Sequence, residues 1–285
     1  MANEFSTYEK GKLVDVPYVA RIPERDLDKT PILECRHLGI DFGGLHAVQD
    51  FNVTLGRTEI AGLIGPNGAG KTTIFNLLTK VYQPTHGSIL LDGVDTANKN
   101  TAQVNQMGIA RTFQNIRLFP NLTVEDNVKI GLHNEMNYSI LDSVFRLPSY
   151  WKQEKVAHER AMELLSIFEM ENVADYPAGA LPYGAQRRLE IVRALATNPS
   201  LLLLDEPAAG MNPSETAELM DNIVKIRDTF HIAVLLIEHD MNLVMGICEG
   251  IVVLNFGQII AKGPAEEIQS NPAVIEAYLG KKKEA

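Results

Sequence analysis

The feature that most constrains the fold is an octapeptide, Gly65-Pro-Asn-Gly-Ala-Gly-Lys-Thr72, which joins an apolar segment to a helix-forming one. It fits the pattern G-x-x-x-x-G-K-[ST], in which glycines allow backbone N–H groups to curl around phosphates. The pattern predicts a strand over residues 59–64 and a helix over residues 72–80. We expect Lys71 to contact the β- and γ-phosphates and the Thr72 hydroxyl to bind Mg²⁺. Chance gives the pattern on the order of once per hundred chains of this length, so it predicts a nucleotide-binding α/β core.

A second apolar segment ends in two acids. Residues 201–204 are all leucine, and Asp205 and Glu206 follow them directly. A buried parallel strand places such side chains at its C-terminal edge, where ligands of α/β sheets bind. We expect Asp205 to hold the Mg²⁺ shell through water, and Glu206 to polarise the water that attacks the γ-phosphate. Apolar strands that end in acids are common, but together with the phosphate-binding loop this one indicates nucleotide hydrolysis.

Predicted strands and helices alternate on both sides of a helical block. Before the block, strands are predicted over residues 32–35, 47–55 and 87–93, and the last ends in an Asp-Gly turn. Within the block, Thr123 starts a helix with a capping pattern, and residues 150–170 carry apolar side chains at helical spacing. After the block, elements are predicted over residues 201–204, 213–230, 232–237, 240–248, 251–254 and 272–279. This order predicts an α/β core with an inserted α-helical subdomain.

Composition narrows the class of protein further. The 285 residues include 26 Lys+Arg and 36 Asp+Glu, a formal net charge of −10, which argues against broad electrostatic binding of nucleic acid or anionic lipid. Two cysteines provide no disulfide framework and favour a reducing cytoplasm. Residues 1–31 show neither a sustained period nor a secretory pattern, so we expect an extension there. No apolar run approaches the roughly 20 residues needed to span a bilayer.

A third motif, Leu181-Pro-Tyr-Gly-Ala-Gln-Arg-Arg-Leu-Glu190, precedes the strand of residues 201–204. With it, the sequence resembles the ATP-binding-cassette (ABC) ATPases over nearly all of residues 32–280, and residues 181–185 stand where that family has its signature LSGGQ. The resemblance implies a P-loop NTPase (ABC ATPase) core with an antiparallel β subdomain and an inserted α-helical subdomain. The implied boundaries are an N-terminal extension over 1–31 and an ABC ATPase domain over 32–285, with a core over 32–120 and 187–265, a helical subdomain over about 121–186, and a C-terminal helix and tail over 266–285.

The resemblance also assigns roles residue by residue. Phe42 matches an aromatic that stacks on adenine, Gln114 a glutamine that contacts Mg²⁺ and couples to membrane subunits, and His239 a histidine that contacts the γ-phosphate. Without the family, Phe42 would be a core aromatic, Gln114 a loop residue and His239 a structural histidine, but their order and spacing favour the family roles. Catalysis is therefore expected from Glu206 and His239, with ATP and Mg²⁺ as cofactors. The expected metal ligands are Thr72, Gln114 and Asp205. The expected nucleotide contacts are Phe42, Gly65, Pro66, Asn67, Gly68, Ala69, Gly70, Lys71, Thr72, Thr73, Gln114, Leu181, Tyr183 and Gly184.

Within the family, the details resemble the ATPase of branched-chain amino acid importers. Residues 186–195, 205–213 and 272–280 match that subgroup, as does Tyr183 in place of the first signature glycine. The resemblance implies a second ABC ATPase subunit as the partner in a heterodimer, two transmembrane permease subunits, and a periplasmic or extracellular solute-binding protein that acts indirectly. No nucleic-acid partner is expected. The chain would lie at the cytoplasmic face of the inner or plasma membrane, held there by the permeases.

Three alternatives remain open. Another transporter of the same class, for urea, lipopolysaccharide or another solute, would share these motifs because other subunits choose the solute. A soluble, non-transport ABC ATPase acting on DNA or ribosomes is disfavoured, since the sequence has one phosphate-binding loop and no heptad run. A non-catalytic nucleotide-binding module is disfavoured because Glu206 and His239 are both present.

Two signature positions depart from the family. Pro182 replaces the serine whose hydroxyl binds the γ-phosphate of the opposing subunit, and Ala185 replaces the glutamine. Pro182 has neither a hydroxyl nor a backbone N–H, which predicts that this signature completes a weaker site on the partner. Arg187 and Arg188 follow and are expected on the helix surface or near the dimer seam.

Overall fold

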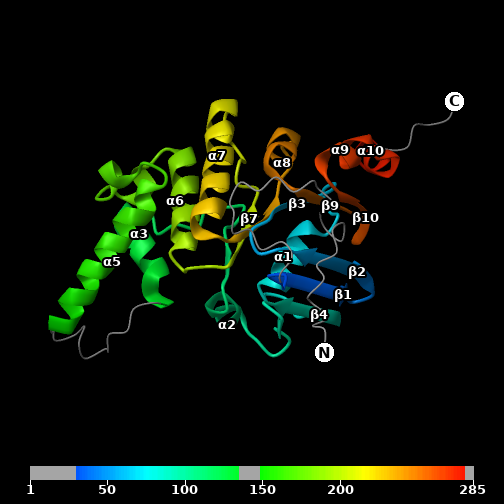
Figure 1. Ribbon diagram of the computed structural model, residues 1–285, viewed down its shortest axis with the longest axis horizontal. Helices are drawn as coiled ribbons and strands as arrows, with labels where there is room; N and C mark the ends of the chain where they lie inside the picture. The colour runs from blue at the N-terminus through cyan, green and yellow to red at the C-terminus, as the bar shows by residue number, and fades with distance from the viewer. Residues whose placement is uncertain (1–29, 135–147, 280–285) are drawn as a thin grey trace.

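The computed structural model describes residues 30–134 and 148–279, which form two sheets and a lobe of helices (Figure 1). Nearly all of the extension expected over residues 1–31 lies outside the described residues, as does the end of the expected C-terminal tail. The strands of the two sheets are interleaved along the chain, and the phosphate-binding loop joins a strand of the larger sheet to the first helix, with the helical lobe inserted later. The expected α/β architecture with an antiparallel β subdomain and an inserted helical part is confirmed.

The smaller sheet is antiparallel. Its strands are β1 (Leu33–Phe42), β2 (Leu45–Leu55), β4 (His86–Leu91) and β5 (Val94–Asp95). They lie in the order β2-β1-β4-β5. Asp92 and Gly93 join the last two strands with φ of 49° and 75°, and positive φ at both positions is what a tight hairpin turn requires. The predicted Asp-Gly turn is therefore present.

The larger sheet is mostly parallel and buried on both faces. Its strands are β3 (Ile60–Ile64), β6 (Ile109–Arg111), β7 (Leu201–Asp205), β8 (Ala233–Ile237), β9 (Gly250–Asn255) and β10 (Gln258–Gly263). They lie in the order β10-β9-β3-β8-β7-β6, and β10 alone among them runs antiparallel to its neighbour. Alternate leucines of β7 face two different hydrophobic clusters, which explains why this strand is continuously apolar.

Helix α1 (Lys71–Leu78) holds the phosphate-binding loop against the core. Its Ile74 and Phe75 are fully buried in the hydrophobic cluster that includes the antiparallel sheet. Gly70 precedes the helix with φ of 105°, and a Cβ there would lie 3.0 Å from the carbonyl oxygen of Ala47. Glycine is required at this position because the backbone is left-handed and closely packed. The loop therefore enters α1 in one fixed geometry.

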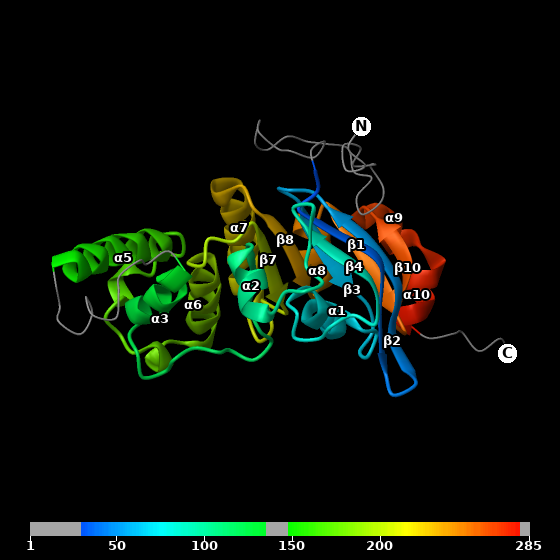
Figure 2. The ribbon, with the colours of Figure 1, turned by 90° about the horizontal axis from the view of Figure 1, so that it is seen from below.

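Helices α7 (Pro213–Phe230) and α8 (Met241–Ile247) contribute to the hydrophobic cluster on the other face of the large sheet. Beyond them, α3 (Val124–Gly131), α5 (Pro148–Ser166) and α6 (Tyr183–Leu195) form the helical lobe, which Figures 1 and 2 show at one end of the molecule, away from the antiparallel sheet. The remaining helices are α2 (Thr101–Gln106), α9 (Ala265–Ser270) and α10 (Pro272–Leu279).

Several element boundaries differ from the sequence prediction. Helix α7 spans the predicted residues 213–230, but α5 ends at Ser166 rather than at residue 170. The early end has a local cause, because Glu169 adopts a left-handed φ of 55° that a right-handed helix cannot contain. Strand β10 was not predicted; its side chains are almost all half-buried, so they lack the alternation that marks a strand.

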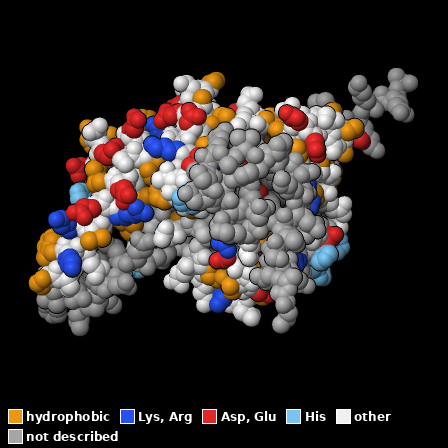
Figure 3. Space-filling model, viewed as in Figure 1, with side chains coloured by type: hydrophobic (Ala, Val, Ile, Leu, Met, Phe, Trp, Pro, Cys, Tyr) orange, Lys and Arg blue, Asp and Glu red, His pale blue; other side chains and the backbone are white. Residues whose placement is uncertain are grey.

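Membrane-spanning helices, the two cysteines and the surface charges are features on which both the composition and the described residues bear. None of the described helices is long and apolar enough to cross a membrane. Cys35 and Cys248 are both free and buried, and burial raises the pKa of the Cys35 thiol to about 12. Acidic and basic side chains are intermingled over the helical lobe on the face shown in Figure 3. Both cysteines are therefore core residues of low reactivity.

Candidate functional site

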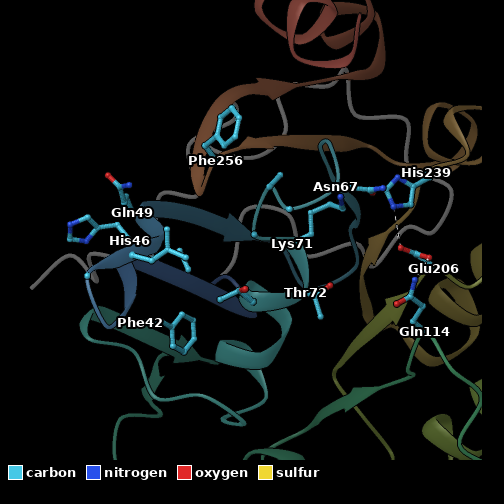
Figure 4. Close-up of a pocket in the computed structure, with 17 residues that line it drawn as sticks. Phe42, His46, Gln49, Asn67, Lys71, Thr72, Gln114, Glu206, His239 and Phe256 are labelled. Carbon is cyan, nitrogen blue, oxygen red and sulfur yellow. Dashed lines mark hydrogen bonds and ion pairs between the residues drawn. The ribbon is translucent and has the colours of Figure 1, made fainter. Parts of the chain in front are cut away.

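A cavity of about 920 Å³ lies over the phosphate-binding loop and gathers most of the predicted site (Figure 4). Segments far apart in the sequence line it: the β1–β2 turn, the loop and the start of α1, and residues after β6, β7, β8 and β9. The predicted residues in its lining are Phe42, Asn67, Gly68, Ala69, Gly70, Lys71, Thr72, Thr73, Gln114, Glu206 and His239. The larger sheet thus delivers polar side chains at the carboxyl ends of its strands, as expected for an α/β fold.

The phosphate-binding loop is curled around the Lys71 side chain. Lys71 Nζ donates to the carbonyl oxygens of Gly65 (2.6 Å) and Pro66 (3.0 Å), two predicted contacts that do not line the cavity themselves. Gly65 has φ of 150°, and a Cβ there would lie 2.1 Å from a carbonyl oxygen of β9, so only glycine fits. Burial lowers the pKa of Lys71, while the nearby carboxylates of Glu206 and Asp205 act in the opposite direction. The loop presents one partly desolvated amine where phosphate oxygens would lie.

Glu206 links two other predicted residues, Gln114 and His239. One of its carboxylate oxygens accepts from Gln114 Nε2 (2.7 Å), and the other lies 3.1 Å from His239 Nε2 (Figure 4). Its backbone has φ of 50°, an uncommon conformation for a residue other than glycine and one that clusters at active sites. The backbone N–H of Glu206 donates to the carbonyl oxygen of Ile237 (2.9 Å), which ties this conformation to β8. The carboxylate is held from both sides at the edge of the cavity.

Asp205, the expected metal ligand, is buried in an ion pair. Arg111 Nη2 donates to Asp205 Oδ2 at 2.7 Å, and the two side chains are 6% and 5% exposed. The other arm of Arg111 donates to Asn76 on α1 at 2.7 Å, and the guanidinium lies against the rings of Phe75 and Phe113. Asp205 does not line the cavity. The role of Asp205 toward a metal ion, expected to act through water, stays a prediction.

A second buried carboxylate braces the two loops that carry Glu206 and His239. Glu238 Oε1 accepts from the backbone N–H of Ala208 (2.7 Å), and Oε2 accepts from the backbone N–H of His239 (2.9 Å). Burial raises the pKa of Glu238, and these hydrogen bonds act against that rise. The segments after β7 and β8 are thereby joined through one side chain.

The signature residues lie at the start of α6, outside the cavity. Pro182 is the N-cap of the helix and makes no side-chain capping hydrogen bond. Leu181 is buried, whereas Tyr183 is 48% exposed. A Cβ on Gly184 would lie 3.1 Å from a carboxylate oxygen of Glu215, so the helix packs closely there. The structure does not bring Leu181, Tyr183 and Gly184 together with the other predicted contacts within this chain.

The expectation that Arg187 lies at the surface is wrong, because this residue is 2% exposed. Its guanidinium donates to the carbonyl oxygens of Phe113 (2.6 Å) and Gln114, and to the Tyr183 hydroxyl (3.1 Å). Glu190, one turn further along α6, accepts from the backbone N–H of Phe113 at 3.4 Å, and burial raises the pKa of this carboxyl. Helix α6 therefore holds the backbone that carries Gln114.

Several residues that shape the site were not predicted. Arg111 stands three positions before Gln114, a predicted site residue, so its place in the sequence was a signal that it lies near the site. Glu238 directly precedes His239 at a strand end, which is also a usable signal. His46 and Phe256 line the cavity but belong to no phosphate-binding pattern, so only the folded structure identifies them.

Comparisons with known proteins agree with this geometry. The chain is 46% identical over 250 residues to the high-affinity branched-chain amino acid transport ATP-binding protein BraF of Pseudomonas aeruginosa, covering 88% of this chain and 98% of that protein. It is 45% identical over 250 residues to the corresponding LivG protein of Escherichia coli K12, with the same coverage. A crystal structure of a nucleotide-free ATP-binding cassette from an ABC transporter superposes with a TM-score of 0.77 at 30% identity, covering 88% of this chain and all of that one.

Two family models match the sequence. The model described as "ABC transporter" matches residues 48–209, which include the phosphate-binding loop, the signature and the end of β7. The model described as "Branched-chain amino acid ATP-binding cassette transporter" matches residues 258–284, from β10 onward. The resemblance noted from the motifs is confirmed, and the chain belongs to the ATP-binding, ATP-hydrolysing subunits of ABC transporters.

Proposed function

We propose that this chain is the ATPase subunit of an importer for branched-chain amino acids, at the cytoplasmic face of a membrane. The observation that carries the ATPase part is the meeting of Lys71, Gln114, Glu206 and His239 around one cavity. Support for the solute comes from the named relatives and from the match over residues 258–284. Both relatives are covered almost completely by this chain.

ATP would lie with its base beside Phe42 and its phosphates in the curled loop of residues 65–73. The donor set there fits Mg²⁺, which prefers a few hard oxygen ligands and shares the rest of its shell with phosphates and water. Thr72 offers a hydroxyl, Gln114 an amide oxygen and Asp205 a carboxylate. Among the described residues, no group of three or more His, Cys, Asp or Glu side chains is arranged to hold a metal ion. Mg²⁺ would neutralise charge on the β- and γ-phosphates.

Four residues of this chain would then each have a separate role in hydrolysis. Glu206 is placed to accept a proton from the attacking water, since its carboxylate lies at the cavity edge. Gln114 and His239, one on each oxygen of that carboxylate, would orient it and contact the water and the γ-phosphate. Lys71 would stabilise negative charge on the departing β-phosphate.

We assign Leu181, Tyr183 and Gly184 to the nucleotide of a partner ATPase subunit, because they lie at the start of α6 and away from this chain's own cavity. A helix N-terminus favours an anion through its backbone N–H groups and its dipole. We take the partner to be a different chain, in a heterodimer.

The division of this chain into domains that we propose is a core over residues 32–120 and 187–265, a helical subdomain over about 121–186, and a C-terminal part over 266–285.

Of the two permease subunits, one would dock on this chain where the helical lobe meets the core. A hollow of about 300 Å³ lies there, and its lining includes Phe119, Ile130 and Arg193 of α6. Arg111, which also lines it, contacts Asp205 directly. A permease segment seated in this hollow would contact the residues around Gln114, while the solute-binding protein would act indirectly through the permeases.

The transport function can be tested by reconstitution. We expect the complex of this chain, its partner ATPase and both permeases to hydrolyse ATP faster in proteoliposomes when the solute-binding protein carries leucine, isoleucine or valine. Urea is the comparison solute. Stimulation by urea and not by the amino acids would contradict the assignment of the solute while leaving the ATPase itself in place.

Changing Pro182 to serine tests the prediction about the signature. In a complex whose own site is silenced by Glu206→Gln, only the partner's nucleotide is hydrolysed, and Pro182→Ser is expected to raise that residual rate about tenfold. The reason is one added hydrogen bond to a charged phosphate. Pro182→Ala is the matched control, because it restores the backbone N–H without a hydroxyl. Equal rates for proline, alanine and serine would mean that Pro182 is harmless.

A further inference from the structure

An exposed aromatic side chain at the cavity has no role so far. Phe256, in the turn between β9 and β10, lines the cavity although it is 83% exposed. Its backbone has φ of 45°, a left-handed conformation that bulky side chains rarely adopt. Gly257 follows with φ of 77°, so the two residues form a tight hairpin turn, a position that favours Asn, Asp or Gly over a bulky aromatic.

A backbone hydrogen bond joins the turn that carries Phe256 to the phosphate-binding loop. The backbone N–H of Gly257 donates to the carbonyl oxygen of Ala69 in that loop (2.9 Å), and the Gly257 carbonyl accepts from the backbone N–H of Gln49 (2.8 Å). A Cβ at Gly257 would lie 2.5 Å from the carbonyl oxygen of Ala47, so the turn packs directly on β2. The backbone that carries Phe256 therefore has a set position relative to the loop that would hold phosphates.

A second aromatic ring lies on the opposite side of the same cavity. In Figure 4, Phe256 and Phe42 stand on opposite sides, and Lys71 and Thr72 lie at the far end of the space between them. Phe42 is 43% exposed and packs edge-to-face on Tyr82, with ring centroids 5.3 Å apart. The two rings come from different sheets and are both anchored, one by an aromatic neighbour and the other by backbone hydrogen bonds.

The geometry points to Phe256 as a second aromatic wall of the base subsite, covering the adenine from the side that Phe42 does not. This inference rests on the proposed nucleotide site and adds to it a residue that favours nucleotides over base-free polyphosphates. Every base has a π-face, so an aromatic ring that contacts one contributes measurably to affinity whatever its hydrogen-bonding pattern. Loss of such a contact weakens binding about tenfold.

The test compares a ligand that has a base with one that lacks it. Dissociation constants for ATP and for inorganic tripolyphosphate are measured by titration calorimetry on the full chain and on Phe256→Asn. Asparagine suits the left-handed turn but has no aromatic face, so we expect the melting temperature to hold or rise. ATP affinity is expected to fall about tenfold while tripolyphosphate affinity is unchanged.

Three further variants sharpen the test. Phe256→Tyr keeps an aromatic ring and is expected to retain ATP affinity. Trp151→Ala removes an exposed aromatic side chain of α5, 57% exposed and away from the cavity, and is expected to change neither ligand's affinity. Phe42→Ala reports on the base subsite itself and should weaken ATP binding alone.

The outcomes separate this inference from the proposed site. If Phe42→Ala weakens ATP binding and Phe256→Asn does not, the base subsite exists and Phe256 is not part of it. Equal loss of ATP and tripolyphosphate affinity in Phe256→Asn would show a distorted phosphate loop and would also overturn the inference. If neither variant affects ATP binding, the placement of the base in this cavity is wrong, and both assignments fail together.

Discussion

In a complex whose partner ATPase has its own glutamate neutralised, replacing Glu206 with glutamine is expected to reduce ATP hydrolysis about 10²-fold or more, the usual weight of a lost general base. The carboxylate lies between Gln114 and His239, so glutamine can keep the shape of this cluster while losing the ability to take a proton. Nucleotide binding should persist, because Lys71 and the loop glycines are untouched. Phosphate release and ATP affinity, measured on the same preparation, separate the two effects.

The matched control for this change is Glu218→Gln, which neutralises a glutamate whose side chain is 54% exposed and paired with Arg188. It is expected to leave hydrolysis unchanged, because exposed ion pairs contribute little. If hydrolysis is unchanged in Glu206→Gln when the partner's own glutamate is also neutralised, Glu206 has no role in the mechanism.

Replacing Lys71 with alanine is expected to weaken ATP binding about tenfold or more and to reduce hydrolysis as well. The ammonium meets phosphate oxygens both before and during the reaction, so its loss affects the ground state and the transition state. Hydrogen bonds between a cation and an anion are among the stronger ones in proteins, which sets the size of the effect. Titration calorimetry with ATP measures the binding part, and phosphate release measures the rest.

Lys155→Ala serves as the control for Lys71→Ala. Lys155 lies on α5 in the helical lobe, and its side chain is 78% exposed in a loose pair with Glu159. Removing it changes the net charge by the same amount without touching the cavity. If Lys71→Ala binds ATP as tightly as the unchanged protein does, the role assigned to Lys71 is wrong.

The parts of the site that the sequence predicted are those built from consecutive residues. The loop of residues 65–72 carries its own geometry, because glycine placement and the following helix determine where its N–H groups point. Asp205 and Glu206 were predictable for a related reason, since a continuously apolar strand delivers whatever follows it to one edge of the sheet. Local pattern and strand direction are sufficient in both cases.

The unpredicted parts depend on contacts between distant segments. Arg111 and Asp205 are 94 positions apart, and Arg187 and Phe113 are 74 apart. An arginine on an amphipathic helix is most often exposed, so Arg187 gave no sign that it would be buried among carbonyl oxygens. The first pairing depends on β6 and β7 lying side by side in the larger sheet, and the second on how α6 packs against the segment after β6.

The guanidinium of Arg187 has a consequence for how two ATP sites would communicate. It contacts the Tyr183 hydroxyl at the start of α6 and the carbonyl oxygen of Gln114 beside Glu206. In the heterodimer proposed above, Tyr183 faces the partner's nucleotide and Gln114 faces this chain's own. One side chain would then contact both sites, so a shift of Tyr183 on binding the partner's nucleotide would pass through Arg187 to the backbone of Gln114, whose side chain donates to Glu206.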